Sequence, residues 1–162
     1  MGGFVLAEER TKLIERYRDG YAAIAEALLK ITPEELGFKP DPKRWSVREI
    51  VHHLADSEMT AAVRLRMLIA QDRPTLQGYD QDRWVSELRY REVPLGTALH
   101  QLAGLREGNL ALARNLTPAQ LERIGRHSER GEESVALMLR LMAGHDLVHR
   151  RQMDRILEVA AR

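Results

Sequence analysis

Apolar residues recur along this chain at intervals of three or four positions, which is the spacing of an amphipathic helix. Four long segments show it: residues 8–31, 47–70, 95–116 and 132–160. The stretches between them are polar and rich in proline or glycine, so we expect connections there. Four amphipathic helices that share one core predict an all-α fold. The arrangement we expect is a four-helix bundle formed by a single domain over residues 1–162.

Capping residues indicate where two of the helices begin. Ser46 and Glu49 have the spacing of a capping box, in which each side chain bonds to the backbone N–H of the other residue. The second helix should therefore start directly after Ser46. Trp45 stands just ahead of this cap and is a candidate for the apolar contact that fixes how the chain enters the helix. Thr117 followed by Pro118 predicts a short capped turn after the third helix.

The longest connection lies between the second and third helices. Residues 71–94 are polar and contain Pro74 and Gly78, and connections of this length in compact domains are often functional. This length also leaves room for a crossover in place of a simple up-down-up-down order. Trp84 is either part of a lid over a site or an anchor for the connection. A second polar stretch, residues 125–131, is expected to be a loop before the last helix.

Composition and charge exclude several classes of protein. The 162 residues include no cysteine, which excludes disulfides, thiolate metal sites and a cysteine nucleophile. Lys and Arg number 25 against 24 Asp and Glu, a balance that is poor for general nucleic-acid binding, so we expect no nucleic-acid partner. No apolar run reaches the roughly 20 residues that span a bilayer. The start of the chain lacks the features of a signal peptide, so we expect a cytoplasmic protein with no membrane partner.

The last helix carries the first candidate site. Advancing about 100° per residue places one set of apolar side chains on a common face; its members are Met138, Leu141, Met142, Val148, Ile156 and Val159. His145 and His149 fall in the middle of that face, with Gln152 one turn further on. Two buried imidazoles need hydrogen-bond partners or a metal ion, and a spacing of four lets both bind one ion. The alternative is a pair of core histidines bonded to backbone or carboxylate groups.

The second helix offers a third ligand and a carboxylate. By the same rotation His53 lies at the flank of the apolar stripe, whereas His52 lies nearly opposite and should face water. Glu58 falls near the centre of the stripe, where an unpaired carboxylate is costly. It could orient a ligand histidine, accept a proton, or pair with Arg64 or Arg66 of the same helix.

Three histidines around one divalent ion define a particular kind of chemistry. They leave coordination positions open for water or substrate, as in catalytic zinc sites. Bound water can then have its pKa lowered to about 7, which gives a nucleophile at neutral pH, and a bound thiol would be held as thiolate. Imidazole suits zinc, nickel, iron and copper alike, so the ligands do not name the metal. Among these four metals, zinc or nickel is the one we expect in this site.

The remaining histidines and arginines have plainer explanations. His127 is expected to be an exposed loop residue, the alternative being a place at the mouth of the pocket. His100 should face solvent on the third helix. Arg150, Arg151 and Arg155 could draw an anionic substrate, but a solvated arginine-rich face explains them equally well.

Two distant motifs together resemble a known family. The stretch WSVREIVHHLADSE at residues 45–58, followed by HDLVHRRQ at residues 145–152, resembles the DinB/YfiT-like superfamily. The resemblance covers nearly the whole chain. It implies a four-helix bundle in which one histidine of the second helix and an HxxxH pair of the last helix bind a divalent metal. It assigns those roles to His53, His145 and His149.

The resemblance also implies a range of functions. The superfamily includes enzymes that use a low-molecular-weight thiol, such as bacillithiol or mycothiol, as well as metal-dependent hydrolases, and homodimers are common in it. We therefore expect a divalent-metal-dependent enzyme with a small-molecule substrate, either a thiol S-transferase or a hydrolase. Glu58 is the candidate catalytic residue, and we expect a homodimer. The alternative is a non-catalytic, metal-binding, stress-related dimer.

Overall fold

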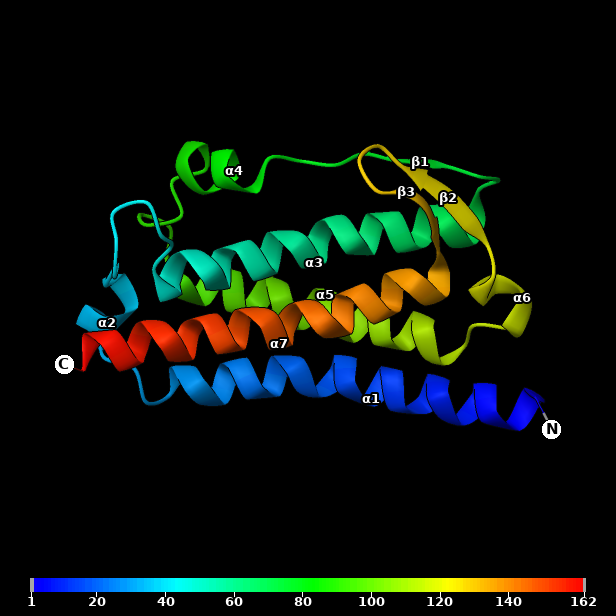
Figure 1. Cartoon of the computed structure of the whole chain (residues 1–162), viewed down its shortest axis with the longest axis horizontal. Helices are drawn as coiled ribbons and strands as arrows, with labels where there is room; N and C mark the ends of the chain where they lie inside the picture. Colours follow the sequence, from blue (N-terminus) through cyan, green and yellow to red (C-terminus); the bar gives the residue numbers. More distant parts are fainter. Residues whose placement is uncertain (1, 162) are drawn as a thin grey trace.

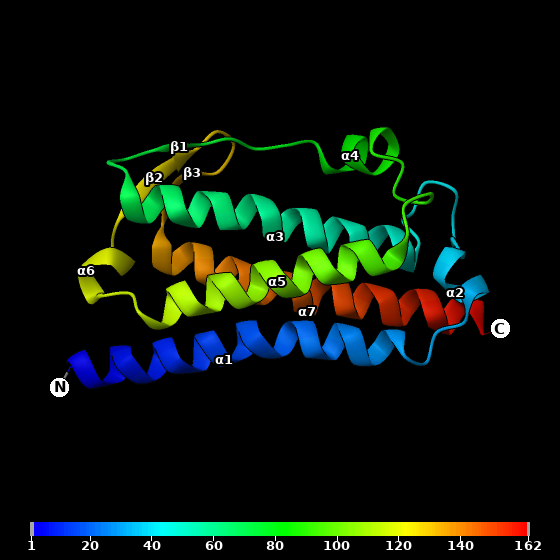
Figure 2. The ribbon, with the colours of Figure 1, turned by 180° about the vertical axis from the view of Figure 1, so that it is seen from behind.

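A computed structural model describes residues 2–161 of the chain, with the side chains of residues 8–161. Four long helices run side by side along the molecule (Figures 1 and 2), namely α1 (Gly2–Leu28), α3 (Val47–Ala70), α5 (Leu95–Arg114) and α7 (Val135–Ala160). Three short helices lie in the connections: α2 (Pro33–Gly37), α4 (Gln81–Glu87) and α6 (Pro118–Leu121). The predicted four-helix bundle is confirmed.

The helix ends follow local hydrogen bonding. Ser46 accepts a bond from the N–H of Glu49, and the Glu49 side chain accepts one from the N–H of Ser46, so α3 begins where the capping box predicted. The capped turn predicted at Thr117 is also present. The first helix ends at Leu28, earlier than expected, because a further capping box at Thr32 starts the separate helix α2.

The order of the helices in the bundle is not the order of the chain. Both α1 and α3 pack against α5 and α7, so α1 and α3 lie diagonally across the bundle. In Figure 1, α3 and α5 run in one direction, whereas α1 and α7 run in the other. Residues 71–94 return along the bundle between α3 and α5. The crossover for which this length left room is present, and the connection contains β1 (Thr75–Leu76) and α4.

The prediction of a polar loop over residues 125–131 is wrong. There β2 (Ile124–His127) and β3 (Gly131–Ser134) form an antiparallel hairpin, and β1 pairs with β2 in parallel. Gly131 at the turn has a φ of +85°, a conformation that glycine adopts without strain. More buried and more exposed residues alternate along β2, as expected for a strand. Four residues are too few for this alternation to stand out in the sequence. The sheet ties the crossover connection to the segment that leads into α7.

Two apolar clusters fill the bundle on either side of a polar layer. One cluster contains Leu65 and Leu139, and the other contains Ile50, Leu102 and Met153. All four long helices contribute to the layer, whose buried polar side chains are Tyr17, Glu58, Arg106, Asn109 and Asp146. Its hydrogen bonds fix how the helices sit relative to one another beside the histidines of α7.

Arg106 lies at the centre of this polar layer. Its guanidinium donates to both carboxylate oxygens of Asp146, at 2.8 and 3.1 Å, and to Oε2 of Glu58 at 2.9 Å. Burial acts to lower the pKa of Arg106, but the bonds and charges of the two carboxylates outweigh it and raise that pKa. A Cβ atom on Gly20 would lie 2.2 Å from Oδ2 of Asp146, so α1 approaches the layer this closely only with glycine there.

The apolar face predicted for the last helix is buried only in part. Met138, Met142 and Ile156 are buried, whereas Leu141 and Val148 are 42% and 59% exposed. Val159, near the end of α7, is also exposed. Leu141 and Val148 line a cleft between α3 and α7, which is why they do not pack in the core. Within the described residues, no helix combines the length and apolar character needed to cross a bilayer.

Candidate metal centre

The structure brings together the three histidines that the sequence singled out. Nε2 of His145 lies 3.1 Å from Nε2 of His53 and 3.1 Å from Nε2 of His149. One nitrogen from each ring lies within 4.8 Å of the other two. Over the described part of the chain, this is the one group of histidine and carboxylate side chains arranged to hold an ion.

The spacing of these nitrogens suits a divalent ion. Zinc–nitrogen bonds of about 2.0–2.1 Å place two ligands of a tetrahedral site roughly 3.3–3.4 Å apart, within a few tenths of an ångström of the two 3.1 Å distances from His145. Nδ1 of His149 donates to Oε1 of Gln152 at 2.9 Å, so the Nε2 lone pair of that ring faces the other two histidines. The residues present therefore fit the divalent metal that the sequence predicted, and Gln152 orients one of the candidate ligands.

Burial keeps the three rings neutral. It lowers the pKa of His53 to about 2, helped by the charges that His145 and His149 would carry. Burial also lowers the pKa of His145 to about 3, with further contributions from His149 and Arg106. The pKa of His149 is lowered by burial and partly restored by its bond to Gln152. A neutral imidazole is the form that binds a metal, so all three rings are available to one at neutral pH.

Trp45 covers one side of the cluster. Its ring centroid lies 4.7 Å from that of His53 and 6.2 Å from that of His149. The rings of Trp45 and His149 are nearly parallel, with an angle of 9° between their planes. Its indole Nε1–H donates to Oδ1 of Asp82 in α4 at 2.9 Å. The residue that precedes the cap of α3 therefore also links the crossover connection to two of the candidate ligands.

The crossover connection makes a second contact beside the cluster through Tyr79. The hydroxyl of Tyr79 lies 2.7 Å from Oγ of Ser57, which lies 3.3 Å from Nε2 of His53. Trp84 packs against the ring of Tyr79 with centroids 4.2 Å apart. These contacts favour the anchor alternative for Trp84, because its ring holds the connection through Tyr79.

A cleft of about 520 Å³ opens beside the histidines. His53 and His145 line it, and it extends between α3 and α7 to the hairpin, where His127 and Arg130 line it. Its volume lies in the range of small-molecule sites, about 300–1,000 Å³. His145 is the partly exposed member of the cluster, whereas His53 and His149 are buried. A small molecule in the cleft would therefore meet the cluster from the side of His145.

Glu58 also lines this cleft, but its oxygens are engaged in the polar layer. Oε1 accepts bonds from Nδ2 of Asn109 at 2.9 Å and from the hydroxyl of Tyr17, and Oε2 accepts from Arg106. Glu58 does form an ion pair, which was one of the roles considered for it. Its partner is Arg106 of α5, however, and not Arg64 or Arg66 of its own helix. Spacing along one helix cannot identify a partner on another helix, which is why Arg106 was missed.

Two histidines that were expected to be exposed are buried. A ring nitrogen of His52 donates to the carbonyl of Val93 at 3.2 Å, and the ring stacks on Tyr90. The crossover connection covers this side of α3, which the pattern of one helix cannot reveal. His127 is only 1% exposed, because it points inward from β2, and it lines the cleft. His100 faces solvent as predicted.

The arginines that flank the histidines on α7 lie outside the cleft, and two of the three are exposed. Arg150 forms an ion pair with Asp154 one turn further along, and both Arg151 and Arg155 are exposed. None of the three arginines lines the cleft. The plainer explanation therefore fits their positions better than recruitment of a substrate does.

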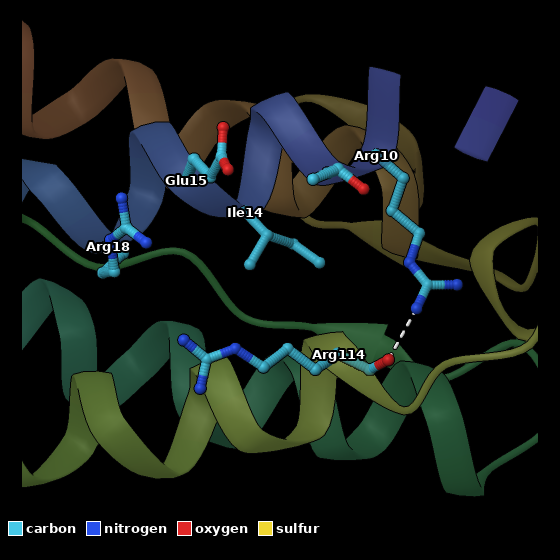
Figure 3. Close-up of a pocket in the computed structure, with 6 residues that line it drawn as sticks. Arg10, Ile14, Glu15, Arg18 and Arg114 are labelled. Atoms are coloured by element: carbon cyan, nitrogen blue, oxygen red, sulfur yellow. Dashed lines mark hydrogen bonds between the residues drawn. The ribbon is translucent and has the colours of Figure 1, made fainter. Parts of the chain in front are cut away.

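A second groove, of about 440 Å³, lies between α1 and α5 (Figure 3). Arg10 donates there to the backbone carbonyls of Arg114 at 2.6 Å and Leu116 at 2.7 Å, and so caps the end of α5. Arg18 pairs with Asp19 at 2.7 Å. The groove contains none of the candidate site residues, and two of its arginines make structural contacts.

Comparison with known proteins gives several matches over most of the chain. The family model of the DinB superfamily matches residues 14–153. A protein of Oceanobacillus iheyensis named "Putative metal-dependent hydrolase" is 30% identical over 126 residues, which cover 78% of this chain and 73% of that protein. A Bacillus mycoides protein with the same name is 29% identical over 147 residues, covering 91% and 84%.

A solved structure shares both the fold and part of the sequence. YfiT from Bacillus subtilis, described as "a probable metal-dependent hydrolase with an unusual four-helix bundle topology", superimposes with a TM-score of 0.81 at 26% identity. The match covers 93% of this chain and 89% of YfiT. The bundle with a crossover connection therefore has a counterpart of known structure.

Proposed function

The chain belongs to the DinB superfamily, and from that premise we propose that it is a divalent-metal-dependent enzyme acting on a small molecule. The observation that carries this proposal is the convergence of three neutral imidazoles beside an accessible cleft. Three protein ligands leave a coordination position open, which is a feature of catalytic sites and not of closed structural ones. The names of the two relatives and the description of YfiT, which refer to metal-dependent hydrolysis, support it.

The three histidines would hold the ion, with zinc or nickel the metals we expect. A divalent ion held by imidazoles lowers the pKa of a water ligand to about 7, or holds a thiol as thiolate, and so supplies a nucleophile at neutral pH. Gln152 orients the ring of His149, and Trp45 shields His149 and His53 from solvent. The exposed side of His145 leaves room for the substrate to approach from the cleft.

Hydrolysis of a small substrate is the reaction we propose first. Transfer of a low-molecular-weight thiol to an electrophile is the second candidate. The chain has no cysteine of its own, so the thiol would have to come from a cosubstrate such as bacillithiol. Both reactions use a nucleophile generated at the same three histidines, and they differ in the molecule that occupies the cleft.

Glu58 as a proton acceptor stays a prediction within this mechanism. To accept a proton, its carboxylate would have to weaken its bonds to Arg106 and Asn109. A Glu58→Gln variant separates the two roles. Loss of a proton acceptor should lower kcat and leave the free energy of unfolding nearly unchanged, whereas loss of a structural partner should lower the free energy of unfolding.

A screen of the metal-loaded protein tests the proposed activity. Zinc- and nickel-loaded protein would be assayed with esters, amides and lactones, and separately with bacillithiol and a panel of electrophiles. We expect turnover that requires metal and that falls about 100-fold or more in His145→Ala. His100→Ala, changed at an exposed position on α5, is the control and should retain activity. Full metal content and full activity in His145→Ala would contradict the mechanism.

The alternative from another class is a non-catalytic, metal-binding, stress-related dimer. Thermal unfolding with and without a chelator separates it from an enzyme, because an ion that binds only the folded state stabilises that state. A large loss of stability on metal removal indicates a structural ion, and a small loss indicates an exchangeable catalytic one. Formation of a homodimer and a cytoplasmic location stay predictions, the first of which sedimentation would test.

A further inference from the structure

The end of the cleft at the β2–β3 hairpin has hydrogen-bond donors with unused capacity. We call it the hairpin end and define it by Arg64 of α3 with His127, Glu129 and Arg130 of the hairpin, all of which line the cleft. The side chain of His127 is almost fully buried, with an exposed fraction of 1%. None of these side chains belongs to the histidine cluster, so the mechanism proposed above assigns them no contact with the reacting atoms.

His127 presents a buried donor without a partner. Its Nδ1 accepts a bond from the backbone N–H of Glu129 at 3.2 Å, so the ring proton lies on Nε2. Nε2 has no hydrogen-bond partner among the described residues. Leaving a buried donor unpaired is costly, which calls for an acceptor in the functional state. Burial and then the charge of Arg130 lower the pKa of His127, so the ring is neutral at pH 7.

Two arginines from different elements add positive charge beside this donor. The guanidinium of Arg64 lies 5.8 Å from the centre of the Tyr79 ring and donates to the carbonyl of Gln77. Burial and then the charge of Arg130 lower the pKa of Arg64, which shows that the two cations repel each other. Arg130 is paired with Glu133, so Arg64 is the cation of the pair without a carboxylate partner. An anion bound here would relieve the repulsion.

We propose that the hairpin end binds a carboxylate or phosphate group of the substrate. His127 donates its Nε2–H to an oxygen of that group, and Arg64 and Arg130 supply the positive charge, since guanidinium groups match both anions. The proposal rests on the proposed function in one respect, namely that the same molecule places its reacting group at the histidine cluster. Arg64 follows His53 by 11 residues on α3, which is about 16 Å of helix axis. The acidic group of the substrate therefore lies at the opposite end of the cleft from the reacting bond.

Glu129 provides a test in the opposite direction. It is an exposed residue of the hairpin turn that lines the cleft, and its side chain lies against Gly78. Its negative charge acts against an anion at the hairpin end. Replacing it with glutamine removes that charge at a position where the fold depends little on the side chain, so Glu129→Gln should bind an anion more tightly.

The binding experiment uses metal-free protein, so it does not depend on catalysis. Inorganic phosphate and succinate are titrated into the full chain and followed by NMR, which registers millimolar binding, and succinamide serves as the neutral match for succinate. We expect Arg64→Gln to raise the Kd for both anions about tenfold and Glu129→Gln to lower it. Arg151→Gln, at an exposed position of α7 outside the cleft, should leave it unchanged. Because Arg64 is only half-buried, thermal melting should find the variant folded.

The outcomes separate this proposal from the proposed function. Equal affinity for succinate and succinamide, or an unchanged Kd in Arg64→Gln, overturns the anion site even if the metal-loaded protein hydrolyses esters. Binding of anions that depends on Arg64, in a protein that turns over nothing in the activity screen, supports the site and counts against the enzyme. A preference for substrates with an acidic group that is lost in Arg64→Gln supports both.

Discussion

The Nε2 atoms of His53 and His145 lie 3.1 Å apart, although 92 positions separate the two residues in the chain. The approach depends on the crossover connection, which leaves α3 and α7 as neighbours in the bundle. Two candidate ligands four positions apart on α7 could be recognised from one helix alone. The third depends on how the bundle is assembled, so the site is a property of the topology as well as of the motif.

The hydrogen bond between His149 and Gln152 gives a prediction about metal affinity. Gln152→Leu removes the acceptor that orients the ring of His149, and loss of such support typically weakens metal binding by about 10–100-fold. We expect the Kd for zinc, measured by competition with a chromogenic chelator, to rise by that factor. Gln152→Glu retains an acceptor and should bind zinc at least as tightly as the wild type. Equal affinity in the leucine variant would show that Gln152 does not support the ligand.

The polar layer gives a prediction about stability. Arg106→Gln leaves the carboxylates of Glu58 and Asp146 buried without their cation, so we expect a loss of about 3–5 kcal/mol in the free energy of unfolding. Urea denaturation followed by circular dichroism measures it. Arg151→Gln on the exposed face is the matched control and should change that energy by about 0.5 kcal/mol or less. A loss below about 1 kcal/mol in Arg106→Gln would contradict a central role for this arginine.

The pKa values of the histidine cluster predict how the stability of the metal-free protein depends on pH. His53 and His145 have pKa values of about 2 and 3 in the folded state, against 6.5 for an ordinary histidine. Below pH 6.5 the unfolded chain binds protons that the folded protein does not, so the free energy of unfolding falls as the pH falls. Above pH 6.5 this contribution is fully present and constant. The midpoint of thermal unfolding, Tm, should therefore drop between pH 7 and pH 5.

A variant without the three rings is the control for this pH effect. Replacing His53, His145 and His149 with glutamine removes the groups that titrate, so the drop in Tm between pH 7 and pH 5 should become smaller. His52 and His127, whose pKa values are also lowered by burial, leave a residual slope. If the triple variant shows the full wild-type slope, the cluster does not control the acid sensitivity of the fold.

Much of the fold and the convergence of the three histidines could be predicted because the information is local. The capping box at Ser46 gives the start of α3 whatever surrounds it, and the spacing of His145 and His149 places both on one face of α7. His53 was chosen over its neighbour by its position relative to the apolar stripe. That comparison needs only the period of the helix, and in the structure it is His53, not His52, that lies beside His145 and His149.

The errors concern contacts between elements. His52 was expected in water, but the crossover connection brings Val93 and Tyr90 against it. His127 was assigned to an exposed loop because four strand residues carry too little periodicity to reveal a hairpin. The partner of Glu58 was sought on α3, whereas Arg106 reaches it from α5. In each case the environment of the side chain depends on another element of the fold, which the pattern of a single segment cannot reveal.

Elemental analysis of protein purified without added metal is the sharpest test of whether the three histidines share one ion. We expect about one divalent ion per chain in the wild type, and little metal in His145→Ala, because two histidines remain where three are needed to complete the site. His100→Ala should match the wild type. A wild-type chain that takes up no divalent ion after incubation with zinc or nickel, or a His145→Ala variant with the full metal content, would contradict a shared site.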